Sequence, residues 1–263
     1  MARERVDVLV AARGLAGSRS EAASLIRAGK VKLAGSGEVV SKPGRTIDDS
    51  VGLEVEGGRE YVSRGGVKLA NALDRLAIDP AGLRCLDVGA STGGFTDCLL
   101  QRGAEAVVAV DVGYGQLDWR LRNDQRVTVM ERFNARNLKA DDLPWAPDLA
   151  VIDVSFISLR LIVPAVSDVL AGDGRMLAMV KPQFELDRAR VGKGGVVREA
   201  ALRREAIRSV AECATGEGLA VAGLAPSGLP GPKGNRETFI YCGRNVDPVA
   251  DLEDAILEAE PDS

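Results

Sequence analysis

A strand, a glycine-rich turn and a helix follow one another directly at residues 83–101. The run from Leu83 to Leu86 is apolar, the turn begins at Asp87, and the pattern from Phe95 to Gln101 is helical. This order is typical of the nucleotide-binding corner of a doubly wound α/β domain, where ligands bind beyond the carboxyl ends of the strands. Glycines in such a turn let the backbone approach a ligand, because no Cβ stands in the way. The expected ligand turn comprises Gly89, Ala90, Ser91, Thr92, Gly93, Gly94 and Phe95.

The spacing of these glycines separates the turn from two commoner nucleotide motifs. It differs from the Gly-x-Gly-x-x-Gly of dinucleotide-binding proteins, and it lacks the Gly-Lys-Ser/Thr of a P-loop. An acidic residue, Asp111, ends the next apolar run, at the point where a carboxylate would accept hydrogen bonds from a ribose hydroxyl pair. These features favour S-adenosylmethionine over NAD as the ligand. A plain structural turn is the alternative.

Composition bounds the class of protein. The chain has 263 residues, 46% hydrophobic and 27% charged, as in a globular protein with one large and one small domain. No apolar run reaches the roughly 18 residues that span a bilayer, and the first residues lack the apolar core of a signal peptide. We therefore expect a cytoplasmic protein without a membrane partner. The four cysteines are scattered and form no Cys-x-x-Cys pair, so we interpret them as small hydrophobic residues of a protein in a reducing compartment. They are Cys85, Cys98, Cys213 and Cys242.

The chain contains no histidine. This excludes every mechanism built on a histidine base and disfavours a transition-metal site, so we expect no metal. Any proton transfer must use a lysine, a carboxylate, a tyrosine, a cysteine or water.

Basic residues concentrate near the N-terminus of an acidic chain. The net charge is −4, yet residues 1–47 hold nine lysines and arginines against four acidic residues. A basic module on an acidic protein indicates a polyanionic partner at that end. The acidic stretch 247–263 is interpreted as a solvated helix or tail. The basic residues are Arg3, Arg5, Arg13, Arg19, Arg27, Lys30, Lys32, Lys42 and Arg45, and the acidic ones Glu4, Asp7, Glu21 and Glu38.

Two short helices and a small sheet are expected in this basic module. Residues 5–15 read as an amphipathic helix closed by Gly14, and residues 18–29 as a second helix with a serine cap and a final glycine. Strand patterns follow at 30–33 and near 53–56. The whole resembles the S4 RNA-binding domain over most of residues 3–50. The residues that carry this resemblance are Arg5-x-Asp7, Gly14-Leu15, Ser18-Arg19, Ala22, Leu25-Ile26, Gly29-x-Val31 and Lys42-Pro43-Gly44.

This resemblance implies RNA contacts along one basic face, through Arg5, Arg19, Lys30 and Lys32. Contacts to phosphates give affinity and salt dependence rather than sequence reading. Solvated helix charges are the alternative. Because the segment has no base-stacking aromatics, we expect recognition of folded RNA by shape and backbone.

Apolar runs alternate with helical patterns from residue 65 onward. Such alternation predicts an α/β fold with a mainly parallel sheet and helices on both faces. Strands are expected at 84–88, 106–111, 126–130, 148–153, 175–181, 218–225 and 237–242. Helices are expected around 65–77, 94–102, 116–123, 158–171 and 199–216.

Charged residues stand at the ends of three of these strands. Asp153 and Lys181 close apolar runs, and Glu237 opens one. Ionised groups beside buried strands cost several kcal/mol unless they are paired. A salt bridge at the rim of the sheet would explain each one alone. Lys68 lies in a helical stretch and reads, by periodicity alone, as a surface lysine.

Lys68, Asp153, Lys181 and Glu237 match, in order, the Lys-Asp-Lys-Glu tetrad of FtsJ-like RNA ribose 2′-O-methyltransferases. With the S4-like start, the chain resembles the TlyA family, often labelled hemolysins, over essentially its whole length. The most specific strings begin at Tyr61 (Tyr-Val-Ser-Arg-Gly-Gly-Val-Lys-Leu), Asp111 (Asp-Val-Gly-Tyr-Gly-Gln-Leu), Asp153 (Asp-Val-Ser-Phe-Ile-Ser-Leu), Val180 (Val-Lys-Pro-Gln-Phe-Glu) and Leu229 (Leu-Pro-Gly-Pro-Lys-Gly-Asn).

The resemblance implies an S4-like domain at 1–58, a linker at 59–64 that follows Gly57 and Gly58, a Rossmann-like class I methyltransferase domain at 65–246, and the acidic tail at 247–263. It implies methyl transfer from S-adenosylmethionine to the ribose 2′-hydroxyl of cytidine in ribosomal RNA, 16S, 23S or both, within ribosomal subunits. The longer, actinobacterial-type members, which act on both subunits, are the most similar. Gly17 stands where such members carry another basic residue, so weaker phosphate contacts are expected there.

The tetrad is chemically suited to this reaction, because a ribose hydroxyl must lose its proton as the methyl group arrives. Lys181, if neutral, would accept the proton, and Lys68 would supply positive charge and hold the phosphate or hydroxyl. Asp153 would orient Lys181, and Glu237 would position Lys68 or the ribose. The division of roles between the two lysines stays open.

Further contacts are implied around this centre. The backbone of 89–95 would contact the methionine part of the cofactor, and Asp111 would bind its ribose. Asp153 would lie near its methyl group, and Asn134 would approach its adenine. RNA contacts are expected from Arg64, Arg132 and Arg136, with solvated loops as the alternative. Residues 184–195 have the glycines and charges of a mobile flap.

Two other functions remain open. A membrane-lytic protein, as the hemolysin label suggests, is disfavoured by the absence of spanning segments and of a long basic amphipathic helix. A catalytically inactive ribosome-binding protein is disfavoured by the tetrad, because its charged residues are costly to keep without activity.

Overall fold

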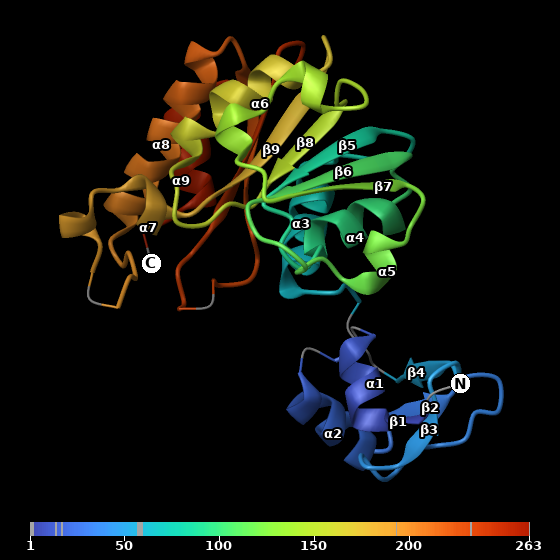
Figure 1. Ribbon diagram of the computed structural model, residues 1–263. Helices are drawn as coiled ribbons and strands as arrows, with labels where there is room; N and C mark the ends of the chain where they lie inside the picture. The colour runs from blue at the N-terminus through green and yellow to red at the C-terminus, as the bar shows by residue number, and fades with distance from the viewer. Residues whose placement is uncertain are drawn as a thin grey trace.

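A small N-terminal unit precedes a larger α/β unit, and each has its own hydrophobic core (Figure 1). The computed structural model describes residues 3–13, 15–16, 18–56, 60–192, 194–231 and 233–262. Four residues named above therefore lie outside the described part of the chain: Gly14, Gly17, Gly57 and Gly58.

In the N-terminal unit, two helices and four short strands enclose a core that includes Val6, Val10, Ile26 and Val31. Ser18 caps the second helix by accepting a hydrogen bond from the amide of Glu21 at 3.1 Å. β1 pairs antiparallel with β3, and β2 with β4. The first pair was not expected, because three-residue strands show almost no periodicity. The elements are β1 (Arg3–Arg5), α1 (Val6–Ala12), α2 (Arg19–Arg27), β2 (Val31–Leu33), β3 (Thr46–Asp48) and β4 (Leu53–Val55).

A seven-stranded sheet forms the larger unit, in the order β10-β11-β9-β8-β5-β6-β7. The strands from β9 to β7 in this order run parallel, and β11 runs antiparallel to both of its neighbours. The mainly parallel α/β fold is thus confirmed. The strands are β5 (Arg84–Val88), β6 (Ala106–Asp111), β7 (Val127–Glu131), β8 (Leu149–Ile152), β9 (Arg175–Val180), β10 (Ala220–Pro226) and β11 (Thr238–Gly243).

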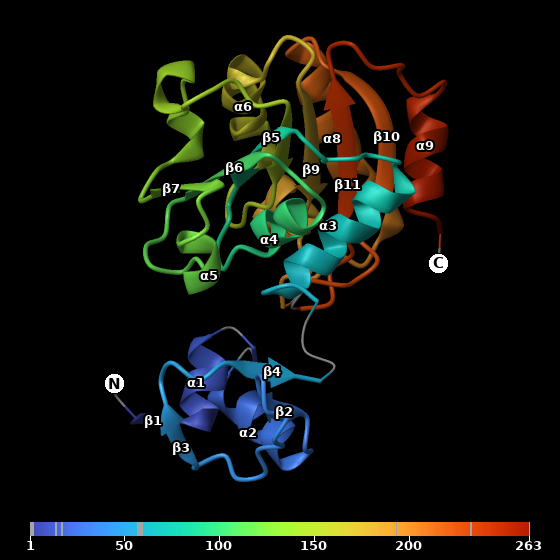
Figure 2. The ribbon, with the colours of Figure 1, turned by 90° about the vertical axis from the view of Figure 1, so that its right-hand side faces the viewer.

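Helices cover both faces of this sheet (Figures 1 and 2). Side chains alternate along each strand, so Leu86 and Val88 pack with α6, α8 and α9, whereas Cys85 packs with α3, α4 and α5. The helices are α3 (Arg64–Arg75), α4 (Gly94–Gln101), α5 (Trp119–Arg122), α6 (Val163–Val169), α7 (Pro182–Glu185), α8 (Ala200–Gly216) and α9 (Leu252–Ala259).

In the larger unit, the helices expected at 158–171 and 116–123 are shorter than predicted. The predicted helix 158–171 is a 3₁₀ turn at Leu159–Leu161 followed by α6. Pro164 lies in the first turn of α6, the part of a helix where a backbone N–H is not needed for an intrahelical hydrogen bond. In a helix that began several residues earlier, Pro164 would lie in the interior and break a hydrogen bond, so α6 begins at Val163. Of the predicted helix 116–123, only α5 forms. The carboxylate of Asp118 accepts a hydrogen bond from the amide of Arg120, so Asp118 is the N-cap and the helix begins after it.

Residues 60–64, expected as part of a linker, pack on the larger unit. Tyr61 is buried in the core that contains α3 and α4, and the Val62 amide donates to the Asp97 carboxylate at 2.8 Å. Ser63 caps α3. The N-terminus of α3 is therefore held firmly against α4, beside the turn that follows β5.

The end of α9 is tied to the rest of the larger unit by a buried carboxylate. Glu260 accepts from Arg203 of α8 at 2.8 Å, and both side chains are buried. Arg236 also approaches Glu260, at 3.2 Å. Arg203 in turn donates to the carbonyl oxygens of Val197 and Arg198. A single charge cluster thus joins α8, the C-terminal segment and two loops.

We expect Glu260→Gln to lower the free energy of unfolding by roughly 3–5 kcal/mol, because it leaves the buried Arg203 guanidinium without its counter-charge. Glu253→Gln is the matched control, since Glu253 forms an exposed ion pair with Arg208 on the same pair of helices. That control should cost less than about 1 kcal/mol. Urea denaturation measures both, and equal effects of the two substitutions would contradict the role assigned to Glu260.

Candidate active site

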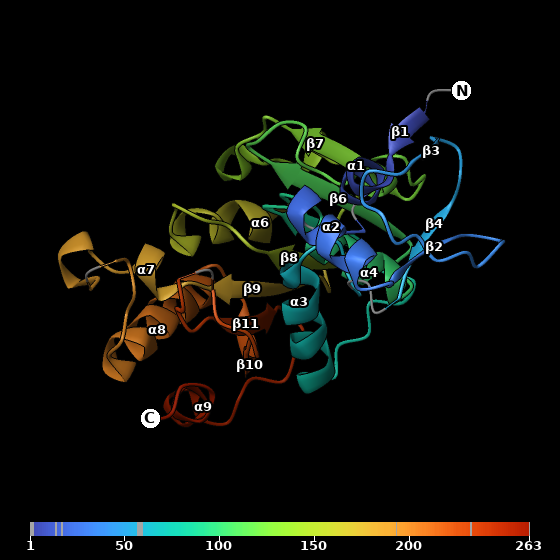
Figure 3. The same cartoon turned by 90° about the horizontal axis from the view of Figure 1, so that it is seen from below.

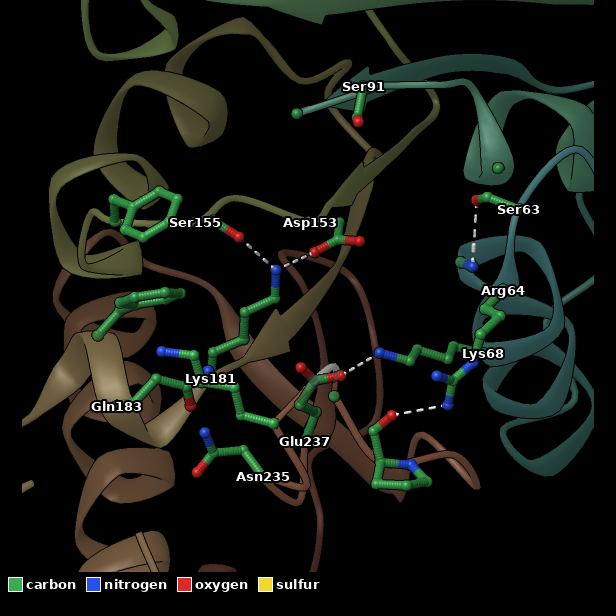
Figure 4. Close-up of a pocket in the computed structure, with 18 of the residues that line it drawn as sticks. Ser63, Arg64, Lys68, Ser91, Asp153, Ser155, Lys181, Gln183, Asn235 and Glu237 are labelled. Carbon is green, nitrogen blue, oxygen red and sulfur yellow. Dashed lines mark hydrogen bonds and ion pairs between the residues drawn. The ribbon is translucent and has the colours of Figure 1, made fainter. Parts of the chain in front are cut away.

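One cavity of about 680 Å³ opens at the carboxyl edge of the sheet and contains all four tetrad side chains (Figure 4). The strand order reverses between β5 and β8, which is where a crevice forms in an open α/β sheet. Of the expected cofactor turn, Gly89, Ala90, Ser91, Thr92, Gly94 and Phe95 line this cavity.

The sheet register explains why three charged residues meet here. Asp153 follows the last residue of β8, and Lys181 follows the last residue of β9. Glu237 precedes β11, which is antiparallel to β9 and pairs Thr238 with Val180. The start of β11 therefore lies at the carboxyl end of β9, and the three side chains share one edge.

Lys181 is held by two groups from the loop after β8. Its Nζ lies 2.5 Å from Asp153 Oδ1 and donates a hydrogen bond to Ser155 Oγ at 2.9 Å. The contact with Asp153 is an ion pair without hydrogen-bond geometry, since Oδ1 has no hydrogen-bond partner among the described residues. Lys181 is buried, so Asp153 supplies an opposite charge at a position shielded from water.

Lys68 reaches across from α3 and donates to Glu237 Oε2 (Figure 4). Both side chains are buried, which explains why periodicity misplaced Lys68 on the surface. A Cβ on Gly231 would lie 2.5 Å from Glu237 Oε1, so the glycine leaves room for the carboxylate. The cavity thus holds two separate lysine–carboxylate pairs.

The turn after β5 approaches the tetrad through Gly89. This residue has φ of +86°, and a Cβ there would collide with the carbonyl oxygen of Asp153. Ser91 also has a positive φ, 49°, and its amide donates to the Asp111 carboxylate at 2.7 Å. The other Asp111 oxygen accepts from the Gly113 amide at 2.6 Å. Asp111 therefore braces the turn and does not itself line the cavity.

Two expected cofactor residues lie elsewhere than anticipated. A Cβ on Gly93 would collide with Leu121 and lie 2.8 Å from Leu117, so this glycine serves the packing of α5 rather than the cavity wall. Asn134 is exposed outside the cavity wall and caps a 3₁₀ turn by accepting from the Arg136 amide at 3.1 Å. The cofactor roles of Asp111 and Asn134 stay predictions.

Several cavity residues were not foreseen. Ser155, Phe156, Gln183, Lys233 and Asn235 line the cavity, as does Phe184, the first residue of the expected flap. They lie in the strings that carried the family resemblance, and that membership was the available signal. Phe156 is 91% exposed and has φ of +65°, and its ring lies 5.2 Å from that of Phe184.

The expected flap forms part of the wall. Val191 and Gly195 line the cavity, whereas Lys193 lies outside the described residues. The buried Asn235 side chain donates to the Gly195 carbonyl at 2.7 Å and accepts from the Val197 amide at 2.9 Å. These bonds join the flap to the loop that carries Glu237. Mobility of the flap stays a prediction.

The two expected RNA-binding arginines of the N-terminal unit share one carboxylate. Arg5 donates to Asp7 at 2.9 and 2.8 Å, and Arg19 donates to it at 3.1 Å. Hydrogen bonds from Arg5, followed by those from Arg19, hold the pKa of Asp7 at about 2 against the opposing effect of burial. Asp7 is buried and both arginines are exposed, so the carboxylate fixes a pair of outward cations.

The other expected RNA residues are dispersed. Arg64 lines the cavity and donates to the Pro230 carbonyl at 2.9 Å. The guanidinium of Arg132 lies 4.2 Å from the centre of the Tyr114 ring. Lys32 is paired with Glu56 at 3.0 Å, whereas Lys30 and Arg136 are exposed and have no carboxylate partner among the described residues.

Asp87 is a buried carboxyl beneath the turn. Its Oδ2 accepts from the amide and hydroxyl of Thr96 at 2.9 and 2.6 Å, whereas Oδ1 has no partner among the described residues. Burial, together with the nearby Asp153 and Asp111 carboxylates, raises the pKa of Asp87 to about 7 against the opposing effect of the Thr96 hydrogen bonds.

Comparisons with known proteins agree with this geometry. The FtsJ-like methyltransferase model matches residues 61–245, and the S4 domain model matches residues 4–54. The chain is 48% identical over 262 residues to the 16S/23S rRNA (cytidine-2′-O)-methyltransferase TlyA of Mycobacterium tuberculosis, across 98% of this chain and 97% of that protein. It is 39% identical over 242 residues to Hemolysin A of Brachyspira hyodysenteriae, across 90% of this chain and 98% of that one.

Solved structures show the same arrangement. A hemolysin-named protein from Streptococcus thermophilus matches with a TM-score of 0.72 and 42% identity, across 98% of this chain and 96% of that one. An S-adenosylmethionine-dependent methyltransferase from Mesorhizobium loti, at a TM-score of 0.51 and 16% identity, covers 69% of this chain and all of that one, and shares the fold alone.

Asp87 predicts a pH-dependent stability. A carboxyl whose pKa is raised on folding stabilises the fold below its unfolded pKa, near 3.8, and this contribution is lost as pH rises through about 7. Asp87→Asn cannot ionise and keeps an acceptor for Thr96. We expect urea denaturation to show that Asp87→Asn gains stability relative to the wild type on going from pH 5 to pH 8. A pH-independent difference would contradict the assignment.

Proposed function

The chain belongs to the TlyA family, in which an S4 domain precedes an FtsJ-like methyltransferase domain, and we propose that it methylates the ribose 2′-hydroxyl of cytidine in ribosomal RNA. The observation that carries this proposal is the single cavity in which a glycine turn adjoins two buried lysine–carboxylate pairs. A methyl donor and a nucleotide hydroxyl would meet there.

The turn after β5 fits S-adenosylmethionine, whose sulfonium centre supplies the methyl group. Its backbone is free of side chains at Gly89, where a Cβ would close the approach to Asp153, and the positive φ of Ser91 keeps the loop open toward the cavity. A volume near 680 Å³ lies within the range of small-molecule sites. Gly89 to Phe95, apart from Gly93, would hold the methionine part, and Asp153 would lie near it.

Lys181 is our candidate for the proton acceptor. A ribose hydroxyl becomes a useful nucleophile only as its proton leaves, and a lysine accepts that proton only in its neutral form. In this structure the ammonium of Lys181 is paired with Asp153, so the lysine must first release a proton. Asp153 and Ser155 orient Nζ, and any positive charge that competes for Asp153 favours this release.

Lys68 and Arg64 are candidates for holding the RNA strand. Lys68 stays paired with Glu237 and adds a fixed positive charge to the cavity. One N–H group of the Arg64 guanidinium donates a hydrogen bond to the Pro230 carbonyl. The remaining N–H groups of Arg64 are available to a phosphate. Lys233, which also lines the cavity, has no carboxylate partner among the described residues. Excess positive charge at the mouth suits a nucleotide with phosphates on both sides.

Phe156 offers a surface for the target base. An exposed aromatic residue in a left-handed conformation is costly to maintain, and such strain concentrates at functional sites. Bases that have left a stack are commonly held against aromatic rings. The Phe184 ring supports Phe156 from the α7 side.

The S4 domain would dock the enzyme on folded RNA through Arg5 and Arg19. Ribosomal subunits are the proposed context, and a ribosomal RNA substrate would place the enzyme in the cytoplasm. For the membrane-lytic alternative, no helix among the described residues is long and apolar enough to cross a bilayer.

The function is tested by incubating the protein with purified ribosomal subunits and with protein-free ribosomal RNA, each with methyl-labelled S-adenosylmethionine. We expect label on the ribose of cytidine, located by mapping 2′-O-methyl positions. Label on bases only would overturn the proposed reaction, and no label on either substrate would overturn the proposed function.

We expect Lys181→Arg to lower single-turnover methyl transfer by roughly 10²–10⁴, the usual effect of removing a positioned base. Arginine keeps the positive charge next to Asp153 but stays protonated and cannot accept a proton. Cofactor and RNA binding should change little, as measured by calorimetry and filter binding. Lys139→Arg, at an exposed position outside the cavity, is the control. Near-normal turnover in Lys181→Arg would leave Lys181 a purely electrostatic role.

Arg19→Ala should weaken RNA binding and reduce the slope of log affinity against log salt by about one, because one phosphate contact is lost. Asp7 keeps its two hydrogen bonds from Arg5 in this variant, so the N-terminal unit should remain folded. Arg208→Ala removes an equal charge from α8 and should leave the slope unchanged. The basic face is only solvated surface if Arg19→Ala binds ribosomal RNA like the wild type across a salt titration.

A further inference from the structure

Exposed apolar side chains gather in one short stretch beside the cofactor turn. Val112 and Tyr114 lie in the loop after β6, and Trp119 begins α5. Tyr114 and Trp119 are each 68% exposed. Large aromatic side chains are normally buried, so two such exposures within six residues indicate a contact surface.

Trp119 stands on a rigid support. Leu117 and Leu121, which flank it, are buried and pack against the position where Gly93 lacks a Cβ. Asp118 caps α5, and the Asn123 side chain donates to the Trp119 carbonyl at 2.7 Å. The indole therefore projects outward from a segment whose backbone is held on both sides. A preorganised ring loses little entropy when it binds.

The charges around this stretch suit an anionic partner. The carboxylates of Asp118 and Glu131 are paired with Arg120 and Arg122. Arg132 instead lies over the Tyr114 ring, in a left-handed conformation with φ of +56°. Arg132 and Arg136 have no carboxylate partner among the described residues, so their charge is available to a ligand.

The position of the stretch fits a substrate strand that enters the cavity. It lies beyond the carboxyl end of β6, at the same edge of the sheet as Asp153 and Lys181. Figures 1 and 2 show α5 on the side of the larger unit that faces the N-terminal unit, and Figure 3 views the molecule from that side. A strand held by both units would pass this surface.

We propose that Trp119 is a stacking platform for an unpaired base of the substrate RNA, flanked by Arg132 and Arg136 as phosphate contacts. The inference rests on the proposed function and deepens it, because the S4 domain contains no aromatic residue that could stack on a base. Stacking on an indole is tolerant of base identity, so this contact adds affinity without choosing the sequence.

The chain has two tryptophans, which makes the contact directly observable. Trp145 lies against Arg84 and is only partly exposed, so Trp145→Phe leaves Trp119 as the sole indole. We expect titration with ribosomal RNA to quench the fluorescence of this variant. Bound RNA should also protect the indole from collisional quenching by acrylamide. No change at RNA concentrations that saturate binding would overturn the proposal.

Affinity measurements supply a second test. Trp119→Ala should weaken RNA binding by roughly 5- to 150-fold, equivalent to one stacked base. Trp119→Phe should recover much of this loss, which a merely structural role would not predict. Leu161→Ala, at another exposed apolar residue, is the control and should bind normally. Turnover at saturating RNA should match the wild type in all three variants.

Other occupants of the surface give different results. Quenching by S-adenosylmethionine alone would assign Trp119 to the cofactor, and quenching by intact subunits but not by protein-free RNA would assign it to a ribosomal protein. Either result would overturn the proposal. Methyl transfer by the wild type, measured alongside, tests the proposed function separately from the role of Trp119.

Discussion

The arrangement of the active site depends on two buried lysine–carboxylate pairs at one edge of a sheet. Four ionised groups in a cavity are unfavourable unless each faces an opposite charge, and here Lys68 pairs with Glu237 and Lys181 with Asp153. The pairing is possible because β8 and β9 end, and β11 begins, at the same edge. The fold thus serves the chemistry by bringing together strand ends that are far apart in the sequence.

Close approach of backbone segments completes this geometry. Gly89 lets the end of β5 pass the carbonyl of Asp153, and a Cβ on Gly94 of α4 would lie 2.9 Å from the amide of Gly66 on α3. The second contact holds α3 against α4, and α3 in turn carries Lys68 to Glu237. The Asn235 side chain couples the flap to the segment before Glu237. Asp153, Lys68 and Glu237 are therefore each positioned by a specific contact of the backbone that carries them.

Sequence patterns predicted the large sheet and its strands within one or two residues, because strands buried on both faces of a parallel sheet read as continuous apolar runs. The tetrad came from family resemblance, since nothing local distinguishes Lys68 from a surface lysine. Gly93 was assigned to the cofactor turn, and its cofactor role stays a prediction. In the structure its missing Cβ leaves room for Leu117 and Leu121, a packing role that a glycine motif alone does not reveal. The exposed faces of Phe156 and Trp119 could not be predicted, because exposure depends on what tertiary structure leaves uncovered.

The structure also divides its cations by chemistry. The cations proposed to hold RNA phosphates include three anchored arginines: Arg5 and Arg19 share the buried Asp7, and Arg64 donates to a backbone carbonyl. A guanidinium remains charged and offers several fixed donors, which suits docking. The two cations paired inside the cavity are lysines, and only a lysine can change its protonation during a reaction. In a chain without histidine, a paired lysine is therefore the side chain best able to combine a stable resting charge with proton transfer.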